Sequence, residues 1–251
     1  MPCVRLVRQG FPADPALDVA VAHALLERAA RAEIGPTLRV YRPGPTVAFG
    51  RLDRLRPGFG AAVSAARGHG FEPVLRQPGG RAAAYDSAAL CLDVVRPEAA
   101  AVPALQVRFA AAADLLAGAL RAVGVDARVG EVPGEYCPGA WTVNARGRVK
   151  LAGTAQRVVR GASLLGAVVL VGGGARVRAV LEAVYAALEL DWDPSTAGAA
   201  DDDVPGLSVH AVERAVLDAY AAIEGGPLPE EALDDATAAR ARELAQGHRL
   251  G

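Results

Sequence analysis

The sequence predicts an α+β protein with a mixed, largely antiparallel sheet flanked by helices. Segments with strand-like alternation and segments with helical periodicity are mixed along the chain. They do not follow the strict strand–helix–strand order that is typical of parallel folds. With 52% hydrophobic and 22% charged residues, the 251-residue chain has an ordinary globular composition and can bury a substantial core.

The N-terminal part is predicted to combine short strands with two helices. Residues 2–7 alternate like a strand. Asp14 and Pro15 are suited to the N-cap and the first position of a helix, and apolar residues follow them at helical spacing. Further strands are expected at residues 37–41, 46–50 and 72–75, and a short alanine-rich helix at residues 58–69.

The central part is predicted to hold the longest strands. Residues 88–95 form a buried strand, on which Cys91 is expected to be a small core residue. A long helix at residues 105–123 follows, with apolar residues at helical spacing. The remaining strands are expected at residues 126–129, 141–144, 149–157 and 162–171, with a turn at 145–148.

The C-terminal part is predicted to be helical. Residues 197–203 (AGAADDD) are the best candidate for a linker, but the segment after them is amphipathic and is expected to pack back. We therefore expect one domain over residues 1–251, with its core at about 2–190 and the helices of 205–251 packed on it. The predicted helices are at residues 175–188, 209–223 and 229–246.

Charge and cysteine content exclude several classes of protein. The net charge of −1 argues against binding to nucleic acid or to a membrane surface by bulk electrostatics. The longest apolar run, residues 162–171, is about half of the ~20 residues that a bilayer requires. Arg5 and Arg8 interrupt the first apolar residues, so no secretory signal is expected. Three widely spaced cysteines predict a cytoplasmic protein without a metal site.

Cys137 is the first candidate for chemistry. It lies in GEYCPGA, where Gly134, Pro138 and Gly139 predict a loop. A cysteine on such a loop can be accessible, and its thiolate can accept an acyl group. The alternative is a half-buried cysteine without a role. Cys3, close to the N-terminus, is the cysteine with the least indication of function.

Residues 76–86 (RQPGGRAAAYD) predict a second candidate site, in which a Pro-Gly-Gly turn joins two strands. Glycine has no Cβ, so the backbone of this turn can approach a ligand closely. Arg76 and Arg81 flank the turn and suit an anion such as a carboxylate or a phosphate. The alternative is an ordinary hairpin turn.

Lys150 is the only lysine among the 27 basic residues. Its ammonium is a compact point charge, whereas a guanidinium is a broad planar fork, so a function at this position would explain why arginine is not used. Chance is the alternative. The strand after Lys150 has small residues and then a polar pair, which suits an extended acyl chain with a polar carbonyl end. These residues are Ala152, Gly153, Thr154, Ala155, Gln156 and Arg157.

Together, these segments resemble the family of lipoate protein ligases and octanoyltransferases, which shares its catalytic fold with biotin protein ligases. One stretch that is typical of the family, G-x-K-x-A-G-x-x-Q-R-x-x-R-G, is matched by residues 147–161, with Lys150 one residue later than usual. The resemblance covers about residues 2–190. The family motif R-x-x-G-G-x-x-V-x-x-D is matched at Arg76, Gly79, Gly80 and Asp86.

The resemblance implies an acyltransferase of lipoate metabolism. Cys137 would accept an octanoyl or lipoyl group as a thioester and pass it to a lysine of a lipoyl-domain protein. Lys150 and backbone amides near Gly153 would stabilise negative charge on the acyl oxygen. The residues expected to contact the substrate are Arg76, Gly79, Gly80, Tyr85, Asp86, Gly147, Ala152, Gly153, Thr154, Ala155, Gln156 and Arg157.

The same resemblance implies the partners of such an enzyme. They would be a donor protein that carries the octanoyl or lipoyl group and a lipoyl-domain acceptor, with no nucleic acid and no membrane. No cofactor and no metal would be required. The apolar segment 162–171 would help to wall a tunnel of octanoyl size, burying ~0.8 kcal/mol per methylene.

Two alternatives stay open at this point. One is an ATP-dependent lipoate-protein ligase, which would need ATP and magnesium and would form a lipoyl-adenylate. Two departures weaken it: Tyr85 stands where many members have histidine, and Arg81 stands where ligases often have a third glycine. Only about sixty residues follow Leu190, so no separate accessory C-terminal domain of the bacterial ligase type is expected. The other alternative is a non-catalytic member that binds an acyl chain or a lipoyl domain.

Overall fold

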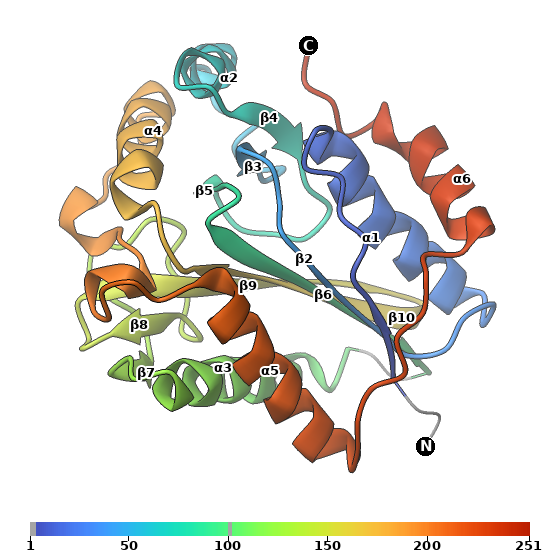
Figure 1. Cartoon of the computed structure of the whole chain (residues 1–251). Coiled ribbons are helices and arrows are strands. Elements are labelled where there is room, and N and C mark those ends of the chain that lie inside the picture. The colour runs from blue at the N-terminus through green and yellow to red at the C-terminus, as the bar shows by residue number, and fades with distance from the viewer. Residues whose placement is uncertain (1–3, 100–101) are drawn as a thin grey trace.

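A seven-stranded mixed sheet forms the centre of the protein (Figure 1). The computed structural model describes residues 4–99 and 102–251. Strand order in the large sheet is β1-β2-β6-β10-β9-β8-β7, and a three-stranded sheet of order β4-β3-β5 lies over one of its faces. The strands are β1 (Arg5–Val7), β2 (Thr37–Tyr41), β3 (Thr46–Phe49), β4 (Glu72–Leu75), β5 (Ala83–Tyr85), β6 (Ala89–Glu98), β7 (Ala127–Val129), β8 (Val143–Ala145), β9 (Val149–Val159) and β10 (Gly161–Leu170).

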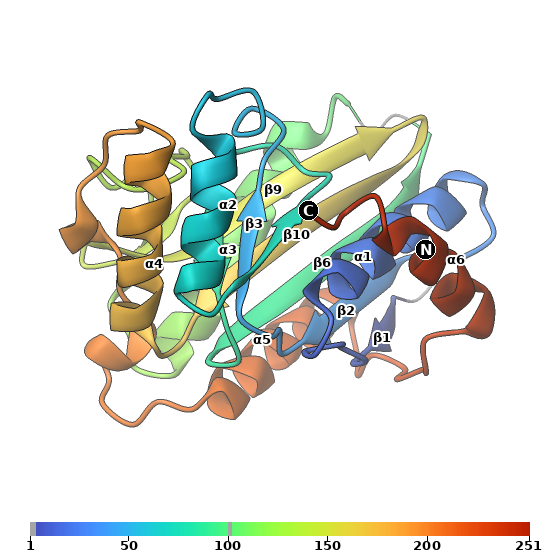
Figure 2. The ribbon, with the colours of Figure 1, turned by 90° about the horizontal axis from the view of Figure 1, so that it is seen from above.

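Helices cover both faces of the large sheet. Helices α3 and α5 pack together on one face, whereas α1 covers part of the other face, with α6 outside it (Figures 1 and 2). Helices α2 and α4 pack together beside the small sheet. The predicted α+β class with a largely antiparallel sheet is confirmed. The helices are α1 (Pro15–Ala30), α2 (Phe59–Gly68), α3 (Leu105–Ala122), α4 (Gly174–Ala187), α5 (Val209–Glu224) and α6 (Asp235–Ala245).

Local chemistry accounts for where the elements begin. Asp14 caps α1, because its carboxylate accepts a hydrogen bond from the Leu17 N–H, and Pro15 occupies the first turn. Strand β10 pairs with β6 along its whole length and with β9 on its other edge, and its side chains pack into core clusters on both faces of the sheet. This burial explains why residues 162–171 are almost entirely apolar.

In the described part of the chain, no helix is long and apolar enough to cross a membrane.

Two predictions for the C-terminal part were wrong. Residues 197–203 are not a linker: Ala197 is fully buried and pairs with Lys150 in an isolated bridge. The last helix begins at Asp235 rather than at residue 229. Residues 229–231 instead extend beside β1, where the Leu6 N–H donates to the Pro229 carbonyl and the Glu231 N–H donates to the Leu6 carbonyl. Asp234 caps the helix that follows. Helix α6 packs on α1.

A buried ion cluster joins α1 to the large sheet. The Arg39 guanidinium has no solvent exposure and donates hydrogen bonds to the carboxylates of Asp18 and Asp93, the latter at 3.1 Å. It also lies 3.8 Å from the centre of the Tyr41 ring. Burial raises the pKa of Asp93 from its ordinary 3.8 to about 6, and the Arg39 charge opposes this rise.

This pKa predicts how an Asp93→Asn substitution behaves with pH. The folded protein binds a proton at Asp93 more tightly than the unfolded chain, so the contribution of this carboxyl to stability falls as pH rises from about 4 to 6. Asparagine has no such dependence. The variant should therefore gain stability relative to the unsubstituted protein over this range, by at most about 1.4 kcal/mol per pH unit. Thermal unfolding of both proteins at pH 4.5 and 7 measures the difference, and a constant difference would contradict the prediction.

Candidate active site

A cavity of about 530 Å³ lies between the large sheet and the small one. Strands β6, β9 and β10 form its floor, the loop between β4 and β5 forms the opposite wall, and residues of α1 and α3 line its sides. Its lining is mostly apolar. Gly153, Ala155 and Gly166 lie on the floor, where their small size leaves space above the sheet. The cavity therefore suits a chain-like apolar ligand with a polar end.

Cys137 lies on a loop, as predicted, and lines this cavity. Its φ of +43° is unusual for a residue with a side chain. The Cys137 N–H donates to the Tyr185 hydroxyl at 2.9 Å, and that hydroxyl donates to the Ala82 carbonyl at 3.0 Å. This relay fixes the cysteine backbone against the β4–β5 loop.

The Cys137 sulfur faces hydrogen-bond donors of the other predicted segment. The Arg81 backbone N–H donates to Sγ at 3.2 Å, and Nη2 of Arg76 lies 3.8 Å from it. Gly80, with a φ of +100°, lies directly against the thiol, since a Cβ there would stand 3.0 Å from Sγ and 2.6 Å from Arg76 Nη2. The structure thus brings together two segments that lie about sixty residues apart in the sequence.

Lys150 is buried, with 3% exposure, and holds the loop that carries Cys137. Its Nζ donates to the Tyr136 carbonyl at 3.0 Å and to the Cys137 carbonyl at 2.7 Å. Glu135 Oε2 lies 3.6 Å from Nζ. Burial lowers the pKa of Lys150, while the neighbouring Cys137 and Glu135 oppose this change. Lys150 therefore anchors the loop that carries Cys137, which was not predicted. Its role at the acyl carbonyl stays a prediction.

Glu135 is a site residue that was not recognised in the sequence. Its Oε1 accepts hydrogen bonds from the Gly139 N–H at 3.0 Å and from the Thr142 hydroxyl at 2.6 Å, so it closes the loop around Cys137. Its other oxygen is buried and accepts no hydrogen bond within residues 4–99 and 102–251. Burial raises the pKa of this carboxyl, and the charge of Lys150 opposes the rise.

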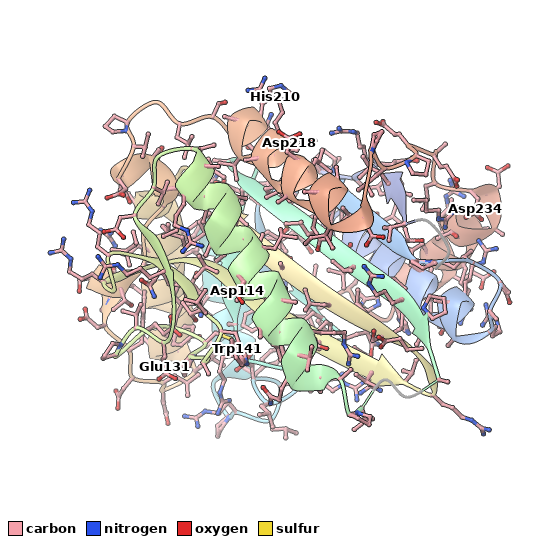
Figure 3. The ribbon with its side chains drawn as sticks, turned by 90° about the horizontal axis from the view of Figure 1, so that it is seen from below. Asp114, Glu131, Trp141, His210, Asp218 and Asp234 are labelled. Atoms are coloured by element: carbon pink, nitrogen blue, oxygen red, sulfur yellow. The ribbon has the colours of Figure 1, made fainter. Side chains whose placement is uncertain are left out.

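The first turn of α3 closes one side of the cavity and was not predicted to do so. Gln156 Nε2 donates to the Leu105 carbonyl at 2.9 Å, and Arg108 Nε donates to Gln156 Oε1 at 2.8 Å. Trp141, which lies beside α3 in Figure 3, donates from Nε1 to Gln106 Oε1 at 3.1 Å. Gln156 therefore fixes the helix to β9.

The other predicted site residues divide into two groups. Arg76, Gly79, Gly80, Tyr85, Gly153, Thr154, Ala155 and Gln156 line the cavity. Four do not. The Asp86 carboxylate accepts hydrogen bonds from the Ala88 N–H and from the Arg176 guanidinium. Gly147 lies in the turn between β8 and β9, with a φ of +73°. Ala152 is buried in the core cluster that includes α3 residues, and Arg157 lines a separate shallow hollow next to Gly79.

Cys91 and His23 also line the cavity. Cys91 is buried, as predicted, and contributes to the cavity floor. Cys3 lies outside the described residues. His23 lines the cavity from α1, and its Nδ1 lies 3.1 Å from Nε2 of His248. No group of His, Cys, Asp and Glu side chains with metal-site geometry occurs in the portion of the chain that the structure describes.

Comparison with known sequences agrees with the resemblance. The family model of the lipoyl protein ligase A/B catalytic domain matches residues 14–192. An octanoyl-[GcvH]:protein N-octanoyltransferase of Geobacillus kaustophilus is 31% identical over 174 residues, which are 69% of this chain and 58% of that protein. A lipoyl-[GcvH]:protein N-lipoyltransferase of Listeria monocytogenes is 28% identical over 148 residues, 57% of this chain and 53% of that protein. The chain thus spans little more than half the length of these curated relatives.

Comparison with solved structures shows the same fold. The crystal structure of a lipoate-protein ligase A bound with ATP has a TM-score of 0.78 at 21% identity, and the match covers 98% of this chain and 95% of that one. A bipartite lipoate protein ligase of Thermoplasma acidophilum, studied with its E2 lipoyl domain, has a TM-score of 0.72 at 20% identity, covering 98% and 93%.

The contacts of Gly80 predict that alanine is not tolerated there. Its φ of +100° and the close approach of Arg76 and Cys137 leave no room for a Cβ. We expect Gly80→Ala to lower the free energy of unfolding by about 1–3 kcal/mol. Gly79→Ala is the matched control, because a Cβ there meets nothing within 4 Å, and it should stay within about 0.5 kcal/mol. Urea unfolding of both variants measures this, and equal losses would contradict the expected role of Gly80.

The contacts of Lys150 predict a coupling with Glu135. Lys150→Met removes both hydrogen bonds to the loop and leaves the Glu135 carboxylate buried without a cation, so we expect a loss of about 3 kcal/mol. Adding Glu135→Gln removes the unpaired charge and should restore part of that stability. A double-mutant cycle by urea unfolding measures the coupling, and purely additive losses would show that the two residues do not interact.

Proposed function

Since this chain belongs to the family of the lipoyl protein ligase A/B catalytic domain, we propose that it transfers octanoyl or lipoyl groups to a lysine of a lipoyl-domain protein. Cys137 carries the proposal, because its thiol lies in the wall of an acyl-sized cavity and its sulfur faces the Arg81 N–H and the Arg76 guanidinium. Both donors stabilise negative charge on sulfur and so assist a thiolate nucleophile.

The first step forms the acyl-enzyme. The Cys137 sulfur attacks the acyl carbonyl carbon of the donor, which is a thioester or a lipoyl-domain amide. The bond from that carbon to the donor sulfur or nitrogen breaks, and the leaving group takes the proton that the thiol gives up. The product is a thioester on Cys137 and a donor freed of its acyl group.

The second step transfers the group to the acceptor. The neutral amine of an acceptor lysine attacks the thioester carbon, the carbon–sulfur bond breaks, and an amide forms. The proton lost by the amine returns to the Cys137 sulfur, so the enzyme regains its starting state. No oxidant, reductant or nucleotide is needed for this balance.

Two cationic residues are suited to stabilise the negative oxygen that develops in both steps. The Arg76 Nε is buried and makes no hydrogen bond within the described residues, so a donor is available beside the thiol. Lys150, which also lines the cavity, adds a positive charge next to the Cys137 carbonyl. Its ammonium has three N–H donors and uses two of them on the Tyr136 and Cys137 carbonyls. Backbone amides near Gly153 stay part of the proposal.

The proposed partners follow from this reaction and from the relatives. The donor is a protein that carries the octanoyl or lipoyl group, as GcvH does in the names of the curated relatives, and the acceptor is a lipoyl-domain protein. Residues 1–251 would act as one catalytic domain. The mostly apolar cavity, with several small residues on its floor, supports an acyl chain as the transferred group.

An ATP-dependent lipoate ligase is the second candidate. The hollow next to the Gly79–Gly80 turn is lined by Arg51 and Arg157, and two arginines beside a glycine turn suit a phosphate group. In that case ATP would activate the acyl group, and Cys137 would be incidental.

Intact mass spectrometry tests the transferase. After incubation with an octanoylated GcvH lipoyl domain and no ATP, we expect the protein to gain the mass of one octanoyl group and Cys137→Ala to gain none. Cys3→Ala serves as the matched cysteine control and should keep the adduct. Acyl transfer by Cys137→Ala that requires ATP would instead establish the ligase. Absence of adduct, transfer and ATP use with every donor would favour the non-catalytic alternative.

A further inference from the structure

Asp93 places a carboxyl group on the floor of the otherwise mostly apolar cavity. Its side chain comes from β6 and is 7% exposed. One oxygen, Oδ2, accepts a hydrogen bond from Arg39 at 3.1 Å. The other, Oδ1, lies 3.9 Å from the point where a Cβ on Gly166 would stand, and accepts no hydrogen bond from the residues that the structure describes. The absence of a side chain at Gly166 leaves this oxygen open to a ligand.

Strand register fixes the distance of Asp93 from the reacting end of the cavity. Gly153, Val168 and Cys91 form one row across the three strands of the floor. Two residues along, Ala155, Gly166 and Asp93 form the next row on the same face. A strand advances about 3.3 Å per residue, so the two rows are ~6.6 Å apart.

The reacting carbonyl belongs near the first row. The Lys150 amine lies 3.8 Å from the point where a Cβ on Gly153 would stand, and it bonds the Cys137 carbonyl. A peptide chain covers ~6.6 Å with six backbone bonds. An extended acyl chain that starts at Cys137 therefore passes Asp93 about six carbon atoms from its carbonyl.

The chemistry of that position distinguishes between acyl groups. A plain alkyl chain that covers Oδ1 removes water from a carboxylate and offers no hydrogen bond in return, which is unfavourable. A thiol on the chain can donate a hydrogen bond to the same oxygen and satisfy it. In an eight-carbon chain, the sixth to eighth carbons are the ones that face Asp93.

We propose that Asp93 is a specificity-determining residue that selects an eight-carbon acyl chain bearing thiols near its far end, the reduced dihydrolipoyl chain, over the octanoyl chain. The proposal rests on the proposed function in that the cavity must hold the transferred acyl group. It adds that the Asp93 carboxyl, which Arg39 holds from behind, sets which acyl group is preferred.

Binding of the free acids tests this without any transfer step. Calorimetry on Cys137→Ala would compare dihydrolipoate, kept reduced by a phosphine, with octanoate at pH 8. We expect dihydrolipoate to bind about ten-fold more tightly. In Cys137→Ala/Asp93→Asn, the carboxylate is replaced by a neutral amide of the same shape, and the ratio of the two dissociation constants should fall to about one.

Asp18→Asn in the Cys137→Ala background is the matched control. Asp18 also pairs with Arg39 but does not line the cavity, so this variant should lose stability while the ratio of dissociation constants stays near ten. The ratio compares two ligands on one protein, so it does not depend on the folded fraction. Equal binding of both acids to Cys137→Ala, no binding of either acid, or a ratio unaffected by Asp93→Asn would overturn the proposal.

The proposed function is tested separately by the acyl-enzyme on Cys137. An octanoyl adduct together with no preference for dihydrolipoate would retain the transferase and reject the role of Asp93. A preference abolished by Asp93→Asn, in a protein that forms no adduct with any donor, would retain the role of Asp93 and reject the thioester route.

Discussion

The hydrogen bonds from Lys150 to two consecutive carbonyls, those of Tyr136 and Cys137, are the contact on which the site depends. Cys137 has a left-handed backbone conformation that a residue with a side chain rarely adopts, so the loop needs contacts that compensate for it. The buried ammonium supplies two hydrogen bonds at that point. With the loop held in this position, the Cys137 sulfur accepts a hydrogen bond from the Arg81 N–H. Each of these contacts would weaken if the lysine were displaced.

The geometry also gives a reason for lysine in a chain that otherwise uses arginine. The Lys150 stem runs past Gly153, where a Cβ would come within 3.3 Å of Cε, so the space along the stem is narrow. A guanidinium is broader and presents its donors in one plane, whereas the two carbonyls converge on a single point. The cost of burying the charge is offset by Glu135, whose carboxylate lies 3.6 Å away and closes the same loop.

Much of the fold could be predicted because its signals are local. The N-cap at Asp14, the apolar segment of β10 and the turn after β8 all depend on residues that are close in sequence. The buried alanines at 197–203 could not be recognised, since small and acidic residues are as common in linkers as in tight packing. In the site, glycine turns and the lone lysine were visible in the sequence. The partner of Lys150 was not, because an isolated glutamate on a loop is usually exposed.

The two ends of the cavity are built from different kinds of contact, and this has a functional consequence. The reacting end depends on loop backbone: carbonyls for Lys150, an N–H for the sulfur and a glycine that lies against it. The far end depends on strand side chains, chiefly the Asp93 carboxyl and the arginine behind it. Under the proposed role of Asp93, a substitution on β6 would change which acyl chain is preferred without moving the thiol. Separate control of chemistry and chain preference is consistent with a family whose members are named for octanoyl transfer in one case and lipoyl transfer in another.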